Sequence, residues 1–68
     1  MNMSRLRDLF KNEGFTIHMH TRRKGLKYVY AAWRDGGKVK QKYFAPQTRA
    51  ELMTEEQVLE KLVLLKIK

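Results

Sequence analysis

The spacing of apolar residues at the start of the chain predicts a helix. Leu6, Leu9 and Phe10 recur at intervals of three and four, which places them on one side of a helix. Ser4 is a suitable residue to cap its first turn. The pattern therefore predicts a short N-terminal helical segment within residues 1–14, which needs another element to pack on because a free helix of this length is marginal in water.

The apolar period changes to two from Phe15 onward. Residues 15–20 alternate apolar and polar side chains, and residues 28–33 are rich in types that favour strands. Asp35-Gly36-Gly37 is a strong hairpin signal, because glycine accepts the positive φ angles of tight turns. Residues 38–44 then form a third strand with its lysines on one face. The segment 15–48 is thus a basic three-stranded antiparallel β-meander.

The last segment, residues 49–68, is predicted to be the helix that packs on this sheet. Thr54 and Gln57 have the spacing of a capping box, which marks a helix start. An apolar stripe follows: Val58, Leu59, Leu62, Val63 and Leu65. Because 68 residues support one core, we expect a single α+β domain in which a C-terminal helix packs on the meander and a short helical segment precedes it.

The net charge of +8 is concentrated in the middle of the chain. Residues 15–48 hold eight cationic side chains and one Asp, whereas the flanking segments carry about equal numbers of both signs. Such a basic segment indicates an anionic partner. Repulsion between its positive charges favours a monomer in the free protein. The residues predicted to contact nucleic acid or an acidic surface are Arg22, Arg23, Lys24, Lys27, Arg34, Lys38, Lys40 and Lys42.

Several classes of chemistry are disfavoured by composition. The chain has no cysteine, which excludes disulfides and cysteine-based zinc sites and fits a cytoplasmic location. No apolar run approaches the roughly 20 residues that span a bilayer. His18 and His20 share a strand face, but their cationic neighbours oppose metal binding. The carboxylates fall at turns and helix ends rather than in a cluster, so we expect a non-enzymatic protein without metal or cofactor. Its richness in Lys, Arg and Glu is typical of thermophiles.

Residues 3–10, MSRLRDLF, carry the functional interpretation that we rank first. They resemble the PCNA-interacting peptide, or PIP box, in which one helical turn presents an aliphatic and two large apolar side chains to a pocket of the sliding clamp. Leu6, Leu9 and Phe10 match the three anchors, and Met3 stands where the motif has Gln. The same spacing is also that of an ordinary helix facing a core.

In size, charge and non-standard motif the chain also resembles the small archaeal inhibitors of the PCNA clamp. This resemblance implies that the N-terminal segment occupies the clamp pocket, denies it to polymerase and other proteins of DNA replication, and so inhibits them. The basic middle would then contact acidic parts of the clamp. The interpretation depends on the N-terminal helix being free to leave the folded domain.

The alternative is DNA or RNA binding through the sheet. Cationic residues give salt-dependent affinity for phosphates, and exposed aromatic rings can stack on bases. The order of three strands and a helix, together with residues 30–43 (YAAWRDGGKVKQKY), resembles the AP2-like arm-binding domains of tyrosine-family integrases. Two plainer explanations stand beside this one. Tyr28, Tyr30 and Trp33 could be core residues under the last helix, and a lysine-rich strand can serve to prevent edge-to-edge aggregation.

Overall fold

The computed structural model describes residues 1–67 and confirms the α+β class, with helices on a three-stranded antiparallel sheet. The sheet order is β1-β2-β3, so each strand pairs with its neighbour in sequence. The elements are α1 (Met3–Asn12), β1 (Thr16–Thr21), a 3₁₀ turn η1 (Arg23–Gly25), β2 (Lys27–Asp35), β3 (Lys38–Pro46), α2 (Gln47–Leu52) and α3 (Glu55–Ile67).

Two helix starts show how local chemistry sets the boundaries. The side chain of Asn2 accepts a hydrogen bond of 2.9 Å from the backbone N–H of Arg5, so the cap of α1 is Asn2 and not Ser4 as predicted. Thr54 and Gln57 form the predicted capping box, in which each side chain accepts a hydrogen bond from the other residue's backbone N–H at 3.2 and 3.0 Å. This cap separates α3 from α2, a short helix that the sequence pattern does not predict.

The two hairpin turns depend on backbone with positive φ. Gly36 and Gly37 connect β2 to β3 with φ of 58° and 82°, as expected for a tight turn. Between β1 and β2, Lys24 adopts φ 58° and Gly25 φ 73°. The β2–β3 pairing has one irregularity, a register shift between Val29 and Tyr30, which lengthens β3 by one residue relative to β2.

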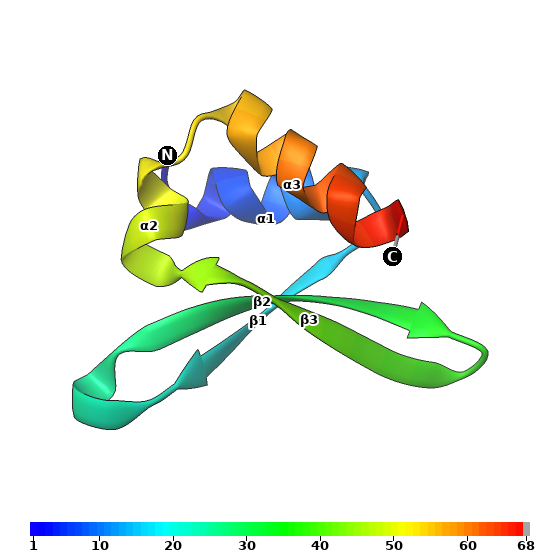
Figure 1. The fold of residues 1–68 in the computed structure, drawn as a ribbon, viewed down its shortest axis with the longest axis horizontal. Helices are drawn as coiled ribbons and strands as arrows, with labels where there is room; N and C mark the ends of the chain where they lie inside the picture. The colour runs from blue at the N-terminus through cyan, green and yellow to red at the C-terminus, as the bar shows by residue number, and fades with distance from the viewer. Residues whose placement is uncertain (68) are drawn as a thin grey trace.

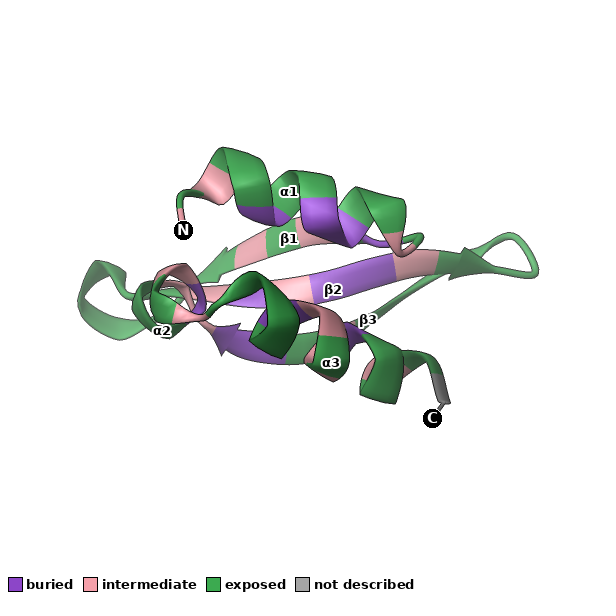
Figure 2. Ribbon diagram, turned by 90° about the horizontal axis from the view of Figure 1, so that it is seen from above, coloured by how far each residue is buried: buried purple, intermediate pink, exposed green. Residues whose placement is uncertain are grey.

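All three helices lie on the same side of the sheet (Figure 1). Seen from above, α1 runs alongside β1 and α3 lies over β3, both broadly along the strands, and their buried segments turn toward one another and β2 (Figure 2). The rings of Phe10 from α1 and Phe44 from β3 meet edge to face, with centroids 4.9 Å apart. The core that results is Leu6, Leu9, Phe10, Phe15, Val29, Ala31, Phe44, Ala45, Ala50, Val58 and Leu62.

The N-terminal helix is therefore part of the core, which contradicts the expectation that it is free to leave. Leu6 and Phe10 are fully buried, Leu9 is 4% exposed, and Met3 packs against them. The bidentate ion pair of Arg5 with Glu55 also joins α1 to α3, with N···O distances of 2.9 and 2.8 Å. Within residues 1–67, no helix has the length and apolar character needed to cross a membrane.

Candidate nucleic-acid interface

The sheet has one covered face and one face that no helix covers, which we call the open face. Val29 and Ala31 of β2 belong to the core, so the alternate residues of this strand point the other way. The residues of β1 and β3 that pair with these alternate residues lie on the same uncovered side of the sheet. The open face consists of Thr16, His18, His20, Tyr28, Tyr30, Ala32, Arg34, Val39, Gln41 and Tyr43, together with Arg22, which directly follows β1 and contacts Tyr28 and Tyr30.

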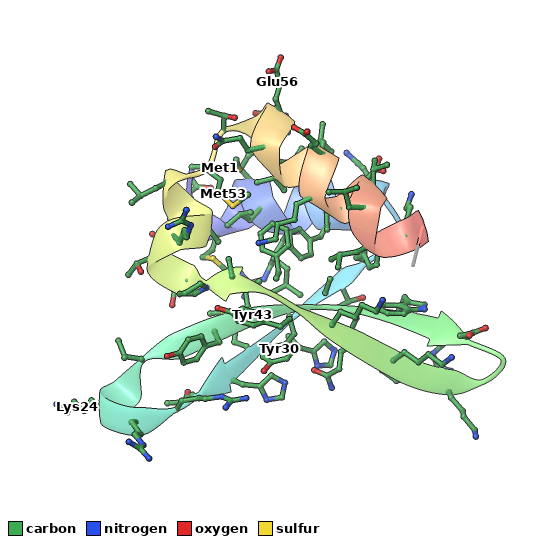
Figure 3. The ribbon with its side chains drawn as sticks, in the orientation of Figure 1. Met1, Lys24, Tyr30, Tyr43, Met53 and Glu56 are labelled. Atoms are coloured by element: carbon green, nitrogen blue, oxygen red, sulfur yellow. The ribbon has the colours of Figure 1, made fainter. Side chains whose placement is uncertain are left out.

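Three tyrosines form a cluster at the centre of the open face. Tyr30 and Tyr43 are paired across β2 and β3, and their ring centroids lie 5.5 Å apart at an angle of 66°. Tyr28 tilts against Tyr43 at 6.1 Å. Tyr43 is 48% exposed, and the other two are half-buried. Figure 3 labels Tyr30 and Tyr43 next to each other at the middle of the sheet. The cluster therefore presents aromatic surface to solvent.

Arg22 joins this cluster from the end of β1. Its guanidinium donates a hydrogen bond of 2.9 Å to the hydroxyl of Tyr30 and lies 5.7 Å from the ring centre of Tyr28, within range of a cation–π interaction. These contacts surround a shallow pocket of about 310 Å³ lined by Arg22 and the three tyrosines. A planar group or an anion that enters it meets aromatic carbon, phenolic hydroxyls and a positive charge.

The two histidines of β1 complete the open face on one edge. The ring of His20 packs edge to face on Tyr30 at 4.4 Å, and its Nε2 lies 2.8 Å from Oε1 of Gln41. His18 pairs with Tyr30 across the strands and is exposed. In the part of the chain that the structure describes, no three His, Cys, Asp or Glu side chains gather as a metal site would require.

The structure divides the predicted cationic contacts between the two faces. Arg22 and Arg34 belong to the open face. Lys38, Lys40 and Lys42 alternate to the side of the helices, as their pairing with Asp35, Trp33 and Ala31 requires. Lys40 forms an ion pair with Asp35 at 2.9 Å and lines a hollow beside Trp33. Arg23, Lys24 and Lys27 are exposed at the β1–β2 end of the sheet.

The aromatic residues divide in the same way. Trp33 packs against the core on the covered side, where it meets Phe15 edge to face at 5.8 Å, and Phe44 is 1% exposed. Tyr28, Tyr30 and Tyr43 lie on the open face instead. Trp33 is thus the one of the three possible core residues named from the sequence that packs against the core, and the rings on the open face have Arg22 for a neighbour. Sequence reasoning missed His20 and Gln41, whose alternation with Met19 and Lys42 was the available signal.

The carboxylates lie among the helices and at the β2–β3 turn. Over residues 1–67, none belongs to the open face. Glu13 pairs with Lys66 at 3.2 Å, and the hydrogen bond from Arg5 holds the pKa of Glu55 below its ordinary value of 4.5. The negative charges thus neutralise cations of the helical layer. Within the described part of the chain, no negative charge on the open face balances its positive charge.

The PIP-like residues form no accessible site in this fold. Exposing Leu6, Leu9 and Phe10 would return three side chains to water, at about 1.5–3 kcal/mol each. The sum, about 5–9 kcal/mol, is as large as the whole stability expected of a 68-residue domain.

Comparison with known proteins adds no further assignment: no family model matches the chain, and searches of curated proteins and of solved structures find no match.

Proposed function

We propose that this chain is a nucleic-acid-binding module that uses the open face of its sheet. One observation carries the proposal: the face left uncovered by the helices combines three tyrosine rings with Arg22 and Arg34 and, among residues 1–67, has no carboxylate. Aromatic rings provide stacking surfaces for bases, and guanidinium groups bind phosphates with charge-assisted hydrogen bonds. The two groups of side chains are adjacent on one surface.

The charge distribution supports the same ligand. The segment from 15 to 48 has a net charge of +7, and its cations at the β1–β2 end adjoin the tyrosine cluster through Arg22. A polyanion gains affinity from such a surface because binding releases the counterions condensed on its phosphates. A neutral or cationic partner gains no such advantage.

Docking on a sliding clamp through residues 3–10 has less support in the structure. It would require α1 to unpack from α3 and the sheet, and the free energy estimated above approaches that of complete unfolding. The open face is accessible without any change in the fold. We therefore rank nucleic-acid binding ahead of clamp binding, the reverse of the order that the sequence favoured.

The test is a binding titration with labelled oligonucleotides over a range of salt concentrations. The variant Arg22→Gln with Arg34→Gln removes two charges from the open face, and Lys38→Gln with Lys42→Gln removes two from the other side of the same sheet. We expect the arginine variant to bind more weakly. If each arginine contacts one phosphate, the slope of log K against log salt becomes shallower by about 1.4–1.8.

The lysine variant is the matched control, because both variants have the same net charge. It should keep most of the affinity and nearly the whole salt slope. Equal losses in the two variants would mean that charge alone matters and that the open face is not the interface. Absence of binding to any oligonucleotide at low salt would refute the proposed function.

A further inference from the structure

We infer that the ligand of the open face is an unpaired nucleic-acid strand, whose bases stack on the tyrosine cluster, rather than a duplex. This inference rests on the proposed function and specifies its ligand. It depends on the aromatic rings that the centre of the open face exposes and on the polar groups of this face that are already hydrogen-bonded. The evidence lies in the contacts of Arg22 with Tyr30 and of His20 with Gln41 and in the exposure of Tyr43.

The centre of the open face presents ring surface more than hydrogen-bonding groups. Tyr43 is 48% exposed, and Tyr28 and Tyr30 line the same pocket. A base in a duplex has both of its flat surfaces covered by neighbouring bases, so these rings cannot stack on it. A base in a single strand is free to stack, and proteins that bind single strands use aromatic side chains in this way.

Two of the groups that could read base edges in a duplex groove are already hydrogen-bonded within the open face. Direct readout in the major groove relies on Arg, Asn or Gln side chains that form paired hydrogen bonds with a base. Here the guanidinium of Arg22 donates to Tyr30, and the amide oxygen of Gln41 is bonded to His20. These contacts hold the rings in place. They also make Arg22 and Gln41 less available to base edges in a groove.

The order of residues along β2 suits a strand that crosses the sheet lengthwise. Tyr28, Tyr30, Ala32 and Arg34 follow one another on the open face, over about 20 Å at the usual rise of a strand. Arg22 contacts the first two, so one end of this row has a guanidinium beside the rings and Arg34 stands at the other end. Phosphates of a single strand can then meet Arg22 and Arg34 while intervening bases stack on tyrosine.

The lysines of β3 that could contact the phosphates of a duplex lie on the side of the sheet that the helices cover. A sheet inserted into a groove is flanked by two rows of phosphates, which call for cations along both edges. On the edge strand β3, Lys38, Lys40 and Lys42 point toward the helices, and the open-face residues of this strand are Val39, Gln41 and Tyr43. That edge offers apolar and aromatic surface instead of charge.

The experiment compares four labelled probes of about 15 units by fluorescence anisotropy at one salt concentration: oligo(dT), oligo(U), a mixed-sequence DNA duplex and an abasic strand that carries phosphates without bases. We expect oligo(dT) or oligo(U) to bind at least about tenfold more tightly than the duplex or the abasic strand. The ratio of the two single strands distinguishes DNA from RNA as the source.

The variant Tyr43→Ala should weaken binding to the preferred single strand by about 5- to 150-fold and leave the weak binding of the abasic strand unchanged. Tyr43→Phe keeps the ring and should stay within about threefold of the parent protein. Circular dichroism of both variants checks that the exposed position does not affect folding.

The opposite results would contradict either this inference or the proposed function. A duplex that binds as tightly as the single strands, or a Tyr43→Ala variant with full affinity for them, would overturn this inference and leave the proposed function standing. Failure of all four probes to bind would refute the proposed function itself.

Discussion

The ring of Phe10 in α1 meets the ring of Phe44 in β3 edge to face, with centroids 4.9 Å apart and planes at 68°. Both side chains are essentially inaccessible to water. The contact joins the first helix of the chain to its last strand, where Lys61 of α3 also lies 5.1 Å from the ring of Phe44. Three elements that are distant in sequence therefore meet at this pair.

The first prediction follows from that contact. The double substitution Leu9→Ala with Phe10→Ala should unfold the chain, because the two truncations cost about 5–10 kcal/mol together and a domain of this length has about 3–10 kcal/mol to lose. Circular dichroism and a urea titration measure the loss. Arg7→Ala, an exposed change on the same helix, should stay within about 0.5 kcal/mol of the parent. A folded double variant that had lost affinity for a sliding clamp would instead restore the clamp hypothesis.

The second prediction concerns the ion pair between Arg5 and Glu55. The hydrogen bond and charge of Arg5 lower the pKa of Glu55 in the folded state, so folding favours the ionised carboxylate. The pair therefore stabilises the domain above pH 4.5, and this contribution disappears as the pH falls through the lowered pKa. The difference in Tm between the parent and Glu55→Gln should be positive at pH 7 and should shrink toward zero as the pH falls through the lowered pKa of Glu55.

Salt and a second variant check the origin of that difference. Both side chains are about half exposed, so added salt should reduce the effect at pH 7. Arg5→Gln should show the same pH dependence as Glu55→Gln, since either change removes the pair. A difference in Tm that does not vary with pH would assign the effect of Glu55 to something other than its charge.

The third prediction tests the turn between β2 and β3. Gly37 has φ 82° and open space around the position that a Cβ would occupy. Gly37→Ala should therefore destabilise the domain by about 1–2 kcal/mol through backbone strain alone. Chemical synthesis with D-alanine at 37 provides the control, because a D residue prefers this φ and should stabilise the fold by about 0.4–1 kcal/mol. Equal effects of the two enantiomers would point to a steric cause.

Much of the fold could be predicted from local chemistry. The alternation after Phe15, the glycine pair of the second turn and the capping box at Thr54 are short-range signals, and all three are confirmed. The short helix α2 was not predicted, since six residues that begin beside Pro46 show too little of a helical period. The cap at Asn2 was missed because Ser4 is an equally good capping residue by type.

The candidate site was harder to predict, because its residues depend on which face of the sheet the helices cover. Alternation correctly separated Val39, Gln41 and Tyr43 from the three lysines. It could not decide that the lysines share the side of α1 and α3, which is a matter of long-range packing. The apolar anchors of residues 3–10 illustrate the same limit: their spacing fits a clamp-binding peptide and a core helix equally well, and only the tertiary contacts separate the two.

The irregular pairing beside Val29 has a consequence for how this small sheet could be redesigned. Because it adds one residue to β3, the consecutive residues Phe44 and Ala45 both fill the interior while Tyr43 still points outward, so different side chains form the interior and the outward surface even at this point. Side chains on the outward surface can therefore be exchanged as a set without disturbing the interior. The domain offers a compact scaffold on which new ligand preferences can be selected.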